Sequence, residues 1–154
     1  MIRYAICIFF AAGITGLAHA DPHEVFDTFS TPGDASHIQI SDCGDGTPCG
    51  TVIWINPETL PPGETQTTAR GQNGELVLGQ TILKEFSRKS KDWRGGTVYD
   101  PENDKRYAAR LKRMTNGNLQ LKGCVGPICQ TQVWKKVTSQ SAKHLTPTHN
   151  DSKG

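Results

Sequence analysis

The stretch from Trp93 to Val137 constrains the fold most, because extended segments and turn-forming residues follow one another along it. Residues 106–113 alternate apolar and polar side chains, which is the period-two pattern of a strand that buries one face. The apolar positions of this segment and of its continuation are Tyr107, Ala109, Leu111, Leu119 and Leu121. Asn116-Gly117 lies between them and favours a tight hairpin, because both residues tolerate positive φ.

Two further turns divide the same stretch. Residues 100–104 are dense in Asp, Asn and Pro, which bend the backbone or bond back to it. Residues 123–129 contain glycines, a proline and two cysteines, and residues 130–137 are interpreted as the returning strand. Alternation places Val133 and Trp134 of that strand on opposite faces. The stretch therefore predicts a four-stranded antiparallel meander.

Residues 1–20 are predicted to form a cleavable secretory signal peptide. Arg3 precedes an apolar segment, and Ala18-His19-Ala20 has the small residues that precede a cleavage site. The apolar segment is short for a membrane span, and no second long one follows. We expect cleavage after Ala20, residence in the periplasm or outside the cell, and no stable membrane insertion.

Charge and length limit the partners and the number of domains. Removal of Arg3 with the signal leaves 16 Lys and Arg against 15 Asp and Glu, a net charge of +1. A nucleic-acid partner normally requires a cationic surface, so none is expected. Residues 21–137 are predicted to form a single domain with one core. Residues 138–154 are polar with one isolated leucine, which predicts a flexible tail.

Four cysteines remain after cleavage, namely Cys43, Cys49, Cys124 and Cys129. An even number in an exported chain predicts two disulfides. Each close pair flanks a predicted turn, so local pairing is preferred, and each such bridge contributes roughly 2 kcal/mol in the chain-entropy treatment. Bridges between the two turns are the alternative. A four-cysteine zinc site is a less favoured possibility, because structural sites usually use closer pairs and reducing compartments.

The chain before residue 93 supplies further strands. Val25-Phe26 is expected to begin the first one, after a frayed terminus. Residues 37–41 and 50–55 are rich in Ile, Val and Trp, and the cysteine-containing turn 42–49 makes them a second hairpin. This acidic turn lacks the carboxylate spacing and terminal glutamate of an EF-hand loop, so no calcium site is predicted.

The middle of the chain is less regular. Residues 56–74 have almost no apolar side chains and predict a long surface loop. Residues 76–86 mix helical and strand periods, so a strand or short helical turn followed by a strand is expected. His144 and His149 lie in the predicted tail, which lacks the rigidity of a metal site. No metal and no cofactor are predicted.

Several motifs in order resemble the small exported bacterial proteins grouped as domain of unknown function 2147. The resemblance rests on Cys43-Gly44-Asp45-Gly46, Cys49-Gly50, Ile53-Trp54-Ile55, Leu78-Gly79, Ile82-Leu83, Phe86, Trp93, Gly95 to Pro101, Tyr107, Gly123-Cys124, Cys129 and Trp134. It implies a Gram-negative envelope or secreted location and an all-β fold similar to lipocalins and other calycins. This fold is an antiparallel up-and-down barrel whose interior can hold a small apolar ligand. It implies no established reaction. The chain has Phe26 where relatives typically have Trp after Gly, and it lacks their Asn-Pro element before residue 70.

The sequence contains no recognisable catalytic constellation, and His37 is the only histidine in a predicted strand. Acids brought together by folding are invisible at this level. We therefore predict a non-enzymatic binder of a small apolar or amphipathic ligand. The candidate binding residues are Trp54, Tyr99, Tyr107, Leu119, Leu121 and Trp134. The alternative is an envelope interaction or structural protein whose barrel is packed solid. Its contact surface would be the loop 56–74 or the face bearing Arg106, Arg110 and Lys112.

Overall fold

The computed structural model describes residues 20–138, so the predicted signal up to residue 19 and the tail from residue 139 lie outside the described residues. The strands within this part are β1 (Thr28–Ser30), β2 (Ser36–Asp42), β3 (Pro48–Ile55), β4 (Thr81–Lys84), β5 (Ser87–Arg88), β6 (Trp93–Asp100), β7 (Lys105–Arg113), β8 (Leu119–Val125) and β9 (Ile128–Lys136). Two short 3-10 helices, η1 (Pro32–Asp34) and η2 (Pro57–Thr59), lie in connections between strands.

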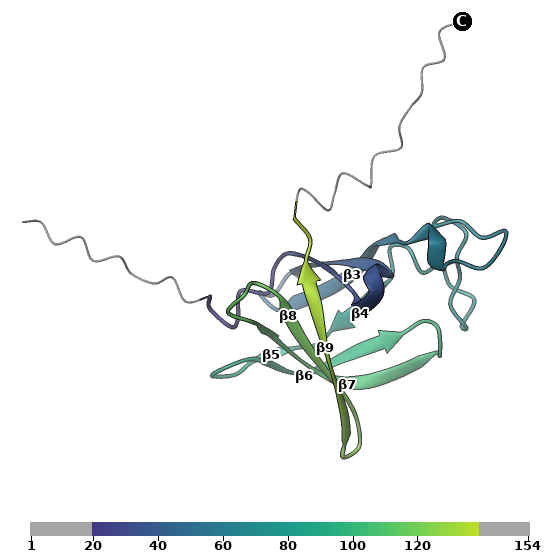
Figure 1. Cartoon of the computed structure of the whole chain (residues 1–154). Coiled ribbons are helices and arrows are strands. Elements are labelled where there is room, and N and C mark those ends of the chain that lie inside the picture. Colours follow the sequence, from purple (N-terminus) through teal and green to yellow (C-terminus); the bar gives the residue numbers. More distant parts are fainter. Residues whose placement is uncertain (1–19, 139–154) are drawn as a thin grey trace, which may run out of the picture.

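Eight of these strands close into an antiparallel barrel (Figure 1). Consecutive strands pair along the chain, Leu83 of β4 pairs with Val98 of β6, and Phe29 of β1 pairs with Lys136 of β9. The short β5 pairs only with β6. The predicted all-β up-and-down barrel is confirmed, and β6 to β9 are its predicted meander.

The barrel interior is filled by side chains from several strands. Members of this core that are at most 1% exposed include Phe29, Ile38, Leu83, Leu111 and Leu119. On β7, Ala109 and Leu111 point inward while Arg110 and Lys112 are exposed, which is the predicted alternation. No helix among residues 20–138 is long and apolar enough to cross a membrane.

The segment before β1 packs onto the barrel, so the predicted frayed terminus is wrong. His23 and Val25 are buried. The indole Nε1–H of Trp93 donates to the His23 carbonyl at 3.0 Å, and the His23 ring Nε2 lies 2.5 Å from the carbonyl of Lys89. The first strand begins at Thr28 and not at Val25-Phe26. A sequence pattern did not reveal these contacts because their partners lie more than 60 residues away.

The ambiguous region 76–86 is also resolved. Its first half is loop, with Gly79 at φ 83°, and its second half contains β4. The predicted surface loop therefore continues to residue 80. It is tied to the β6–β7 turn by a hydrogen bond from the Gln72 N–H to the Pro101 carbonyl at 2.8 Å.

Candidate binding site

The barrel has two ends that differ in what closes them. The terminal end carries the β2–β3 and β7–β8 turns and the incoming segment 21–27, and the loop end carries the long connection 56–80 with the β6–β7 and β8–β9 turns. Figure 1 shows the loop end at the right, with the β8–β9 turn projecting downward. β1 pairs with β9 only through Phe29 and Ser30, so residues 128–134 of β9 extend beyond it.

Burial on the inner face of β7 to β9 falls from the terminal end toward the loop end. Leu111 pairs with Leu121, and Leu119 pairs with Trp134; these are the buried pairs. Farther along the same faces lie Tyr107, which is partly buried, then Val125 and Ile128, which are 60% and 74% exposed. The inner surface is therefore apolar along its length but is covered only at one end.

Three of the six candidate binding residues belong to the packed core. Leu119 is fully buried, and Leu121 and Trp134 are almost so. The indole Nε1–H of Trp134 donates to Gln132 Oε1 at 2.8 Å, which satisfies its one polar atom. These three residues fill the barrel, so a ligand would reach them only by displacing neighbouring side chains.

Tyr99 lies on the outer face of β6 and not among the inward residues. Its neighbour Val98 pairs with Tyr107 on the inner face, and strand alternation directs Tyr99 the other way. The Arg106 guanidinium lies 4.6 Å from its ring centre, and its hydroxyl donates to Asp104 at 2.8 Å. Desolvation, followed by the Asp104 carboxylate, raises the pKa of Tyr99. The predicted lining role does not match this position.

Trp54 and Tyr107 are the two candidates that remain partly exposed near the loop end, and only Tyr107 lies on the inner face. Trp54 pairs with His37 while Val52 pairs with Ile38, so the extra residue Ile53 turns Trp54 to the face opposite Val52. On that outer face the Trp54 ring lies 4.4 Å from that of His37. His37 itself is 3% exposed. The expectation of a half-exposed histidine is therefore wrong: it pairs with Ser30 on the outer face of β2, opposite the inward Ile38, and is buried there.

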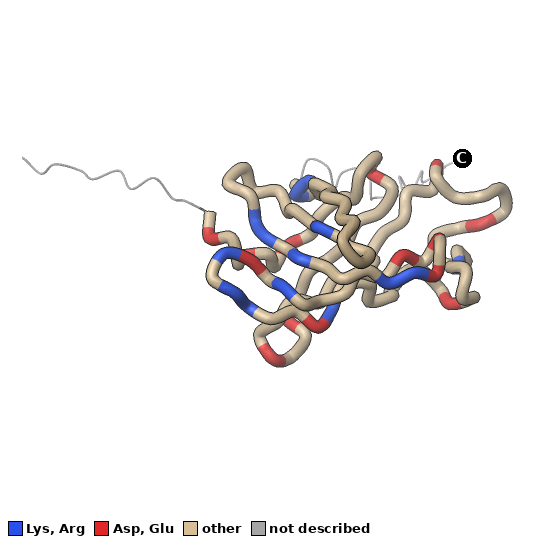
Figure 2. Tube along the Cα trace, turned by 90° about the horizontal axis from the view of Figure 1, so that it is seen from below, with Lys and Arg blue, Asp and Glu red and all other residues tan. Residues whose placement is uncertain are grey.

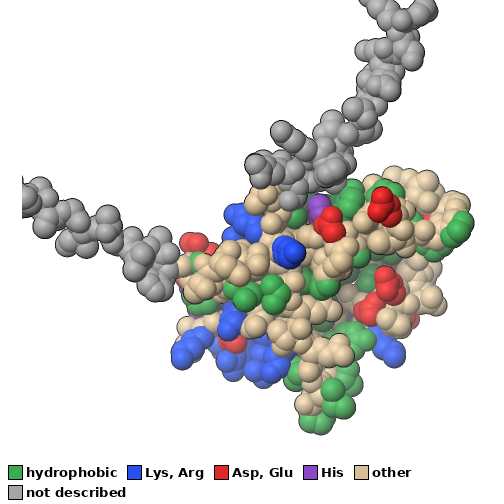
Figure 3. All heavy atoms as spheres, viewed as in Figure 1, with side chains coloured by type: hydrophobic (Ala, Val, Ile, Leu, Met, Phe, Trp, Pro, Cys, Tyr) green, Lys and Arg blue, Asp and Glu red, His purple; other side chains and the backbone are tan. Residues whose placement is uncertain are grey.

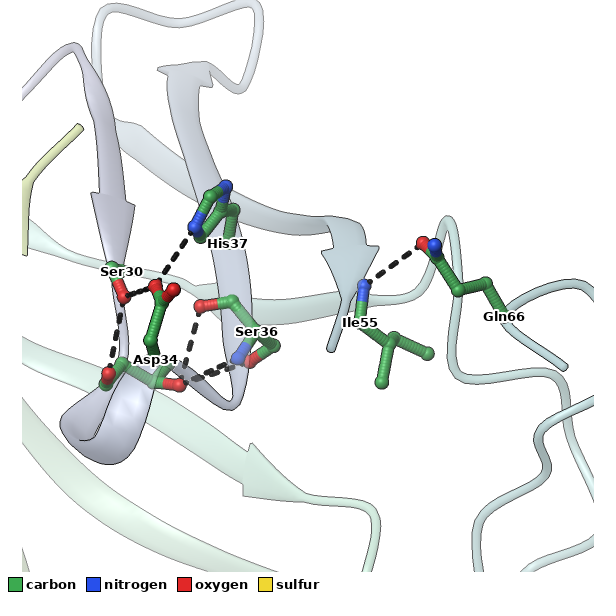
Figure 4. A network of polar contacts seen from close by, with 7 residues as sticks. Ser30, Asp34, Ser36, His37, Ile55 and Gln66 are labelled. Carbon is green, nitrogen blue, oxygen red and sulfur yellow. Dashed lines mark hydrogen bonds and ion pairs between the residues drawn. The ribbon is translucent and has the colours of Figure 1, made fainter. Parts of the chain in front are cut away.

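A polar network holds the β1–β2 connection beside this histidine (Figure 4). His37 Nε2 lies 3.0 Å from Asp34 Oδ1, and the Ser30 hydroxyl donates to the same carboxylate. A hydrolytic triad would place the serine on the imidazole, whereas here it binds the acid. Within residues 20–138, His37 Nδ1 has no hydrogen-bond partner, so no nucleophile is bound there. The network orders a turn in which Asp34 has φ 54°.

The terminal end carries two open hollows that the sequence did not indicate. One, of about 560 Å³, lies against β1 and β2, and the other, of about 370 Å³, lies beside Arg113 and Lys136. Phe26 and Asp27 border both hollows. The Asp27 carboxylate forms ion pairs with the Arg113 guanidinium at 3.1 Å and the Lys136 ammonium at 2.5 Å. Partial burial opposes ionisation of Asp27, yet hydrogen bonds from Lys136, Thr28 and Arg113 lower its pKa.

The cysteines form the two predicted local bridges. Cys43 is bonded to Cys49 and Cys124 to Cys129, with Cα separations of 5.1 and 4.0 Å. These bonds exclude the crossed pairing and the four-cysteine zinc site. In the part of the chain that is described, no three His, Cys, Asp or Glu side chains are grouped to hold a metal ion.

Comparison with known proteins agrees with this architecture. Residues 27–136 match a family described as "Uncharacterized protein conserved in bacteria (DUF2147)". The structure is similar to protein HP1028 from the human pathogen Helicobacter pylori, which is described as belonging to the lipocalin family. That likeness has a TM-score of 0.57 at 16% identity and covers 79% of this chain and 88% of the other. It supports a lipocalin-like fold. A comparison with curated proteins finds no match.

Proposed function

The chain belongs to the domain of unknown function 2147 family, and from its geometry we propose that it is a non-enzymatic protein that binds a small amphipathic molecule at the loop end of its barrel. One observation carries this proposal: the inner face stays apolar toward the loop end but loses its cover. Val98 and Tyr107 are partly exposed there, whereas the same faces are closed at the terminal end. Apolar surface left uncovered on a concave scaffold gains free energy when an apolar group covers it.

An amphipathic ligand suits this end better than a wholly apolar one. Val98 and Tyr107 face each other across β6 and β7, and Gln130 and Gln132 lie on the inner face of β9 and are exposed. Aromatic and aliphatic groups can thus cover a hydrocarbon portion while side-chain amides bind a polar portion. The core beneath is packed, so the ligand would enter shallowly and would not occupy an enclosed chamber.

Export to the periplasm or the cell exterior is part of the same proposal. The predicted signal at residues 1–20 supports it, as do the two disulfides, since such bonds persist in oxidising compartments. The amphipathic products of envelope metabolism would be available to the protein in such a location.

A packed barrel that acts only through its surface is the second candidate. Phe29, Leu111 and Leu119 are each at most 1% exposed, so the barrel needs no ligand to complete its core. This second candidate predicts that ligand binding at the loop end has no role and that the outer surface alone carries the function.

Titration with a polarity-sensitive fluorescent fatty-acid analogue separates the two candidates. We expect saturable binding that weakens about tenfold or more in Tyr107→Ala, since the substitution removes contact area worth about 1.5–3 kcal/mol. Trp54→Ala is the matched control, because Trp54 is a partly exposed aromatic residue on the outer face of the barrel.

Thermal unfolding checks that both variants remain folded. Absence of saturable binding, or equal weakening by the control, would refute the loop-end site and favour the surface reading. Native mass spectrometry of protein purified from the cell envelope supplies an independent measurement, because a bound natural ligand would appear as an added mass.

A further inference from the structure

The turn between β8 and β9 exposes apolar side chains that the barrel does not use. Val125 is paired with Ile128 across the turn, and they are 60% and 74% exposed. Pro127 between them is exposed as well. We call Val125, Pro127 and Ile128 the apolar tip. Ile128 is the most exposed of the large hydrophobic residues within residues 20–138.

The apolar tip is held in place by its own hairpin. The bridge between Cys124 and Cys129 joins the two strands one residue before and after the exposed pair. The tip therefore cannot fold back easily to bury its side chains against the barrel. Its exposure is built into the hairpin and gives it a fixed shape.

The outer face of β7 and β8 carries a second unusual feature. Arg110 lies directly opposite Lys122, and Lys112 lies opposite Gln120. Like charges paired across strands repel each other and destabilise a sheet. Among residues 20–138, no carboxylate forms an ion pair with Arg110, Lys112 or Lys122. We call these three residues the cationic face. The repulsion would be relieved by an external anion.

Both features belong to adjoining strands, with the cations on their outer face and the apolar tip at the end of the hairpin that projects beyond the barrel. Lys122 and Val125 are three residues apart on β8, so their side chains leave opposite faces of the strand, and the apolar tip is reached from the side of the cations because the turn extends past the barrel. In Figure 3 a group of basic side chains and the downward-projecting β8–β9 turn lie on the lower side of the molecule. Figure 2, seen from below, shows Lys and Arg following neighbouring strands on that side. A partner approaching this side would meet cations and an apolar projection together.

We propose that this side docks on an anionic lipid bilayer, with the apolar tip in the interfacial layer and the cationic face over the lipid phosphates. A bilayer surface presents anionic headgroups with hydrocarbon immediately beneath, in the order that the two features require. An acidic polysaccharide would neutralise the cations but would leave the tip in water. The inference goes beyond the proposed ligand function and depends on different residues.

Flotation with phosphatidylglycerol–phosphatidylcholine vesicles tests the proposal on the oxidised, signal-free chain. We expect binding that is lost in Val125→Ser/Ile128→Ser and falls roughly fivefold for each cation removed in Arg110→Gln/Lys122→Gln. Pure phosphatidylcholine vesicles should bind much less, and high salt should weaken binding to the anionic vesicles.

Two matched controls keep the result specific. Ile53→Ser removes an exposed apolar side chain on β3, and Arg70→Gln/Lys84→Gln removes two charges away from the cationic face; both should bind as the parent does. The proposal is overturned if the parent does not float, if the controls lose as much binding as the test variants, or if an acidic polysaccharide binds while vesicles do not. Retention of fatty-acid binding in the tip variant would show that the loop-end site is a separate property.

Discussion

Two hairpins of this barrel are each closed by a disulfide but differ in the residues at their tips. The β2–β3 hairpin is bridged by Cys43 and Cys49, and the β8–β9 hairpin by Cys124 and Cys129. The first projects at the terminal end and the second at the loop end. Since the bridges are alike, the contrast between the tips comes from the residues that each bridge encloses.

The first tip satisfies its own polar groups. The Asp42 carboxylate accepts hydrogen bonds from the N–H groups of Gly44 and Gly46, at 2.7 and 2.8 Å. Asp45 accepts from the hydroxyl and the N–H of Thr47. Such bonds between short acidic side chains and nearby backbone groups stabilise a turn without any partner. The polar groups of this tip therefore need no hydrogen-bond partner from outside the hairpin.

The second tip leaves apolar side chains exposed to water. Val125 and Ile128 leave apolar surface exposed, and the bridge at their base prevents its burial within the chain. Exposed apolar surface becomes favourable only when another apolar surface covers it. The comparison teaches that a disulfide-bridged hairpin can serve a fold alone or can present a contact surface, and the tip chemistry distinguishes the two.

The bases of the two hairpins also differ, and glycine substitution exposes the difference most strongly. A Cβ on Gly50 would lie 2.7 Å from Leu83 Cδ1 and 2.9 Å from Leu83 Cβ, whereas one on Gly123 would meet Tyr107 and Val98 only at 3.7 Å. Leu83 is fully buried and has little room to shift. We expect Gly50→Ala to lower the free energy of unfolding by about 3 kcal/mol and Gly123→Ala to leave it nearly unchanged. Urea unfolding of both variants measures this, and equal stabilities would contradict the asymmetry.

Removing each bridge should give a smaller and more nearly equal loss of stability. Cys43→Ser/Cys49→Ser and Cys124→Ser/Cys129→Ser each open a loop of similar length, so each should cost about 2 kcal/mol in urea unfolding. Vesicle flotation should then separate them, because only the second pair of substitutions loosens the apolar tip. Identical flotation of the two variants would show that rigidity of the tip is unimportant.

Local chemistry made much of this architecture predictable. Asn116-Gly117 marks the β7–β8 turn, and proximity alone paired the cysteines correctly. Alternation likewise identified the inward side of β7 from Ala109 and Leu111. In each case the deciding contacts join residues close in sequence or on one strand, so a short-range pattern contains the necessary information.

Long-range contacts were not predictable in this way. β1 pairs with β9, and His23 is buried against Trp93. Both contacts are between parts of the chain that only the closed barrel brings together. Tyr99 was expected inside because aromatic residues favour cores. It is buried on the outer face instead, near the point where the long loop bonds to the β6–β7 turn. The candidate site was therefore only partly predicted. The bulge at Ile53 turns Trp54 to the outer face, and the exposure of Tyr107 depends on what the rest of the barrel covers.

Acid titration gives the smallest effect on this comparison, and of the two hairpin tips it acts only on that of β2–β3. The Thr47 hydroxyl, followed by the Thr47 N–H, lowers the pKa of Asp45 below its ordinary value of 3.8. A lowered carboxyl pKa contributes stability that is present above the ordinary value and is lost as the pH falls through the lowered one, so the change is expected below about pH 4. In a carbon-13 titration, Thr47→Val should raise the Asp45 midpoint toward 3.8 because the hydroxyl donor is absent. Resonances of residues 125–128 should not move in the same range, since no titratable side chain lies among them. An Asp45 midpoint at or above 3.8 in the parent chain would contradict the hydrogen bonds from Thr47 to the Asp45 carboxylate.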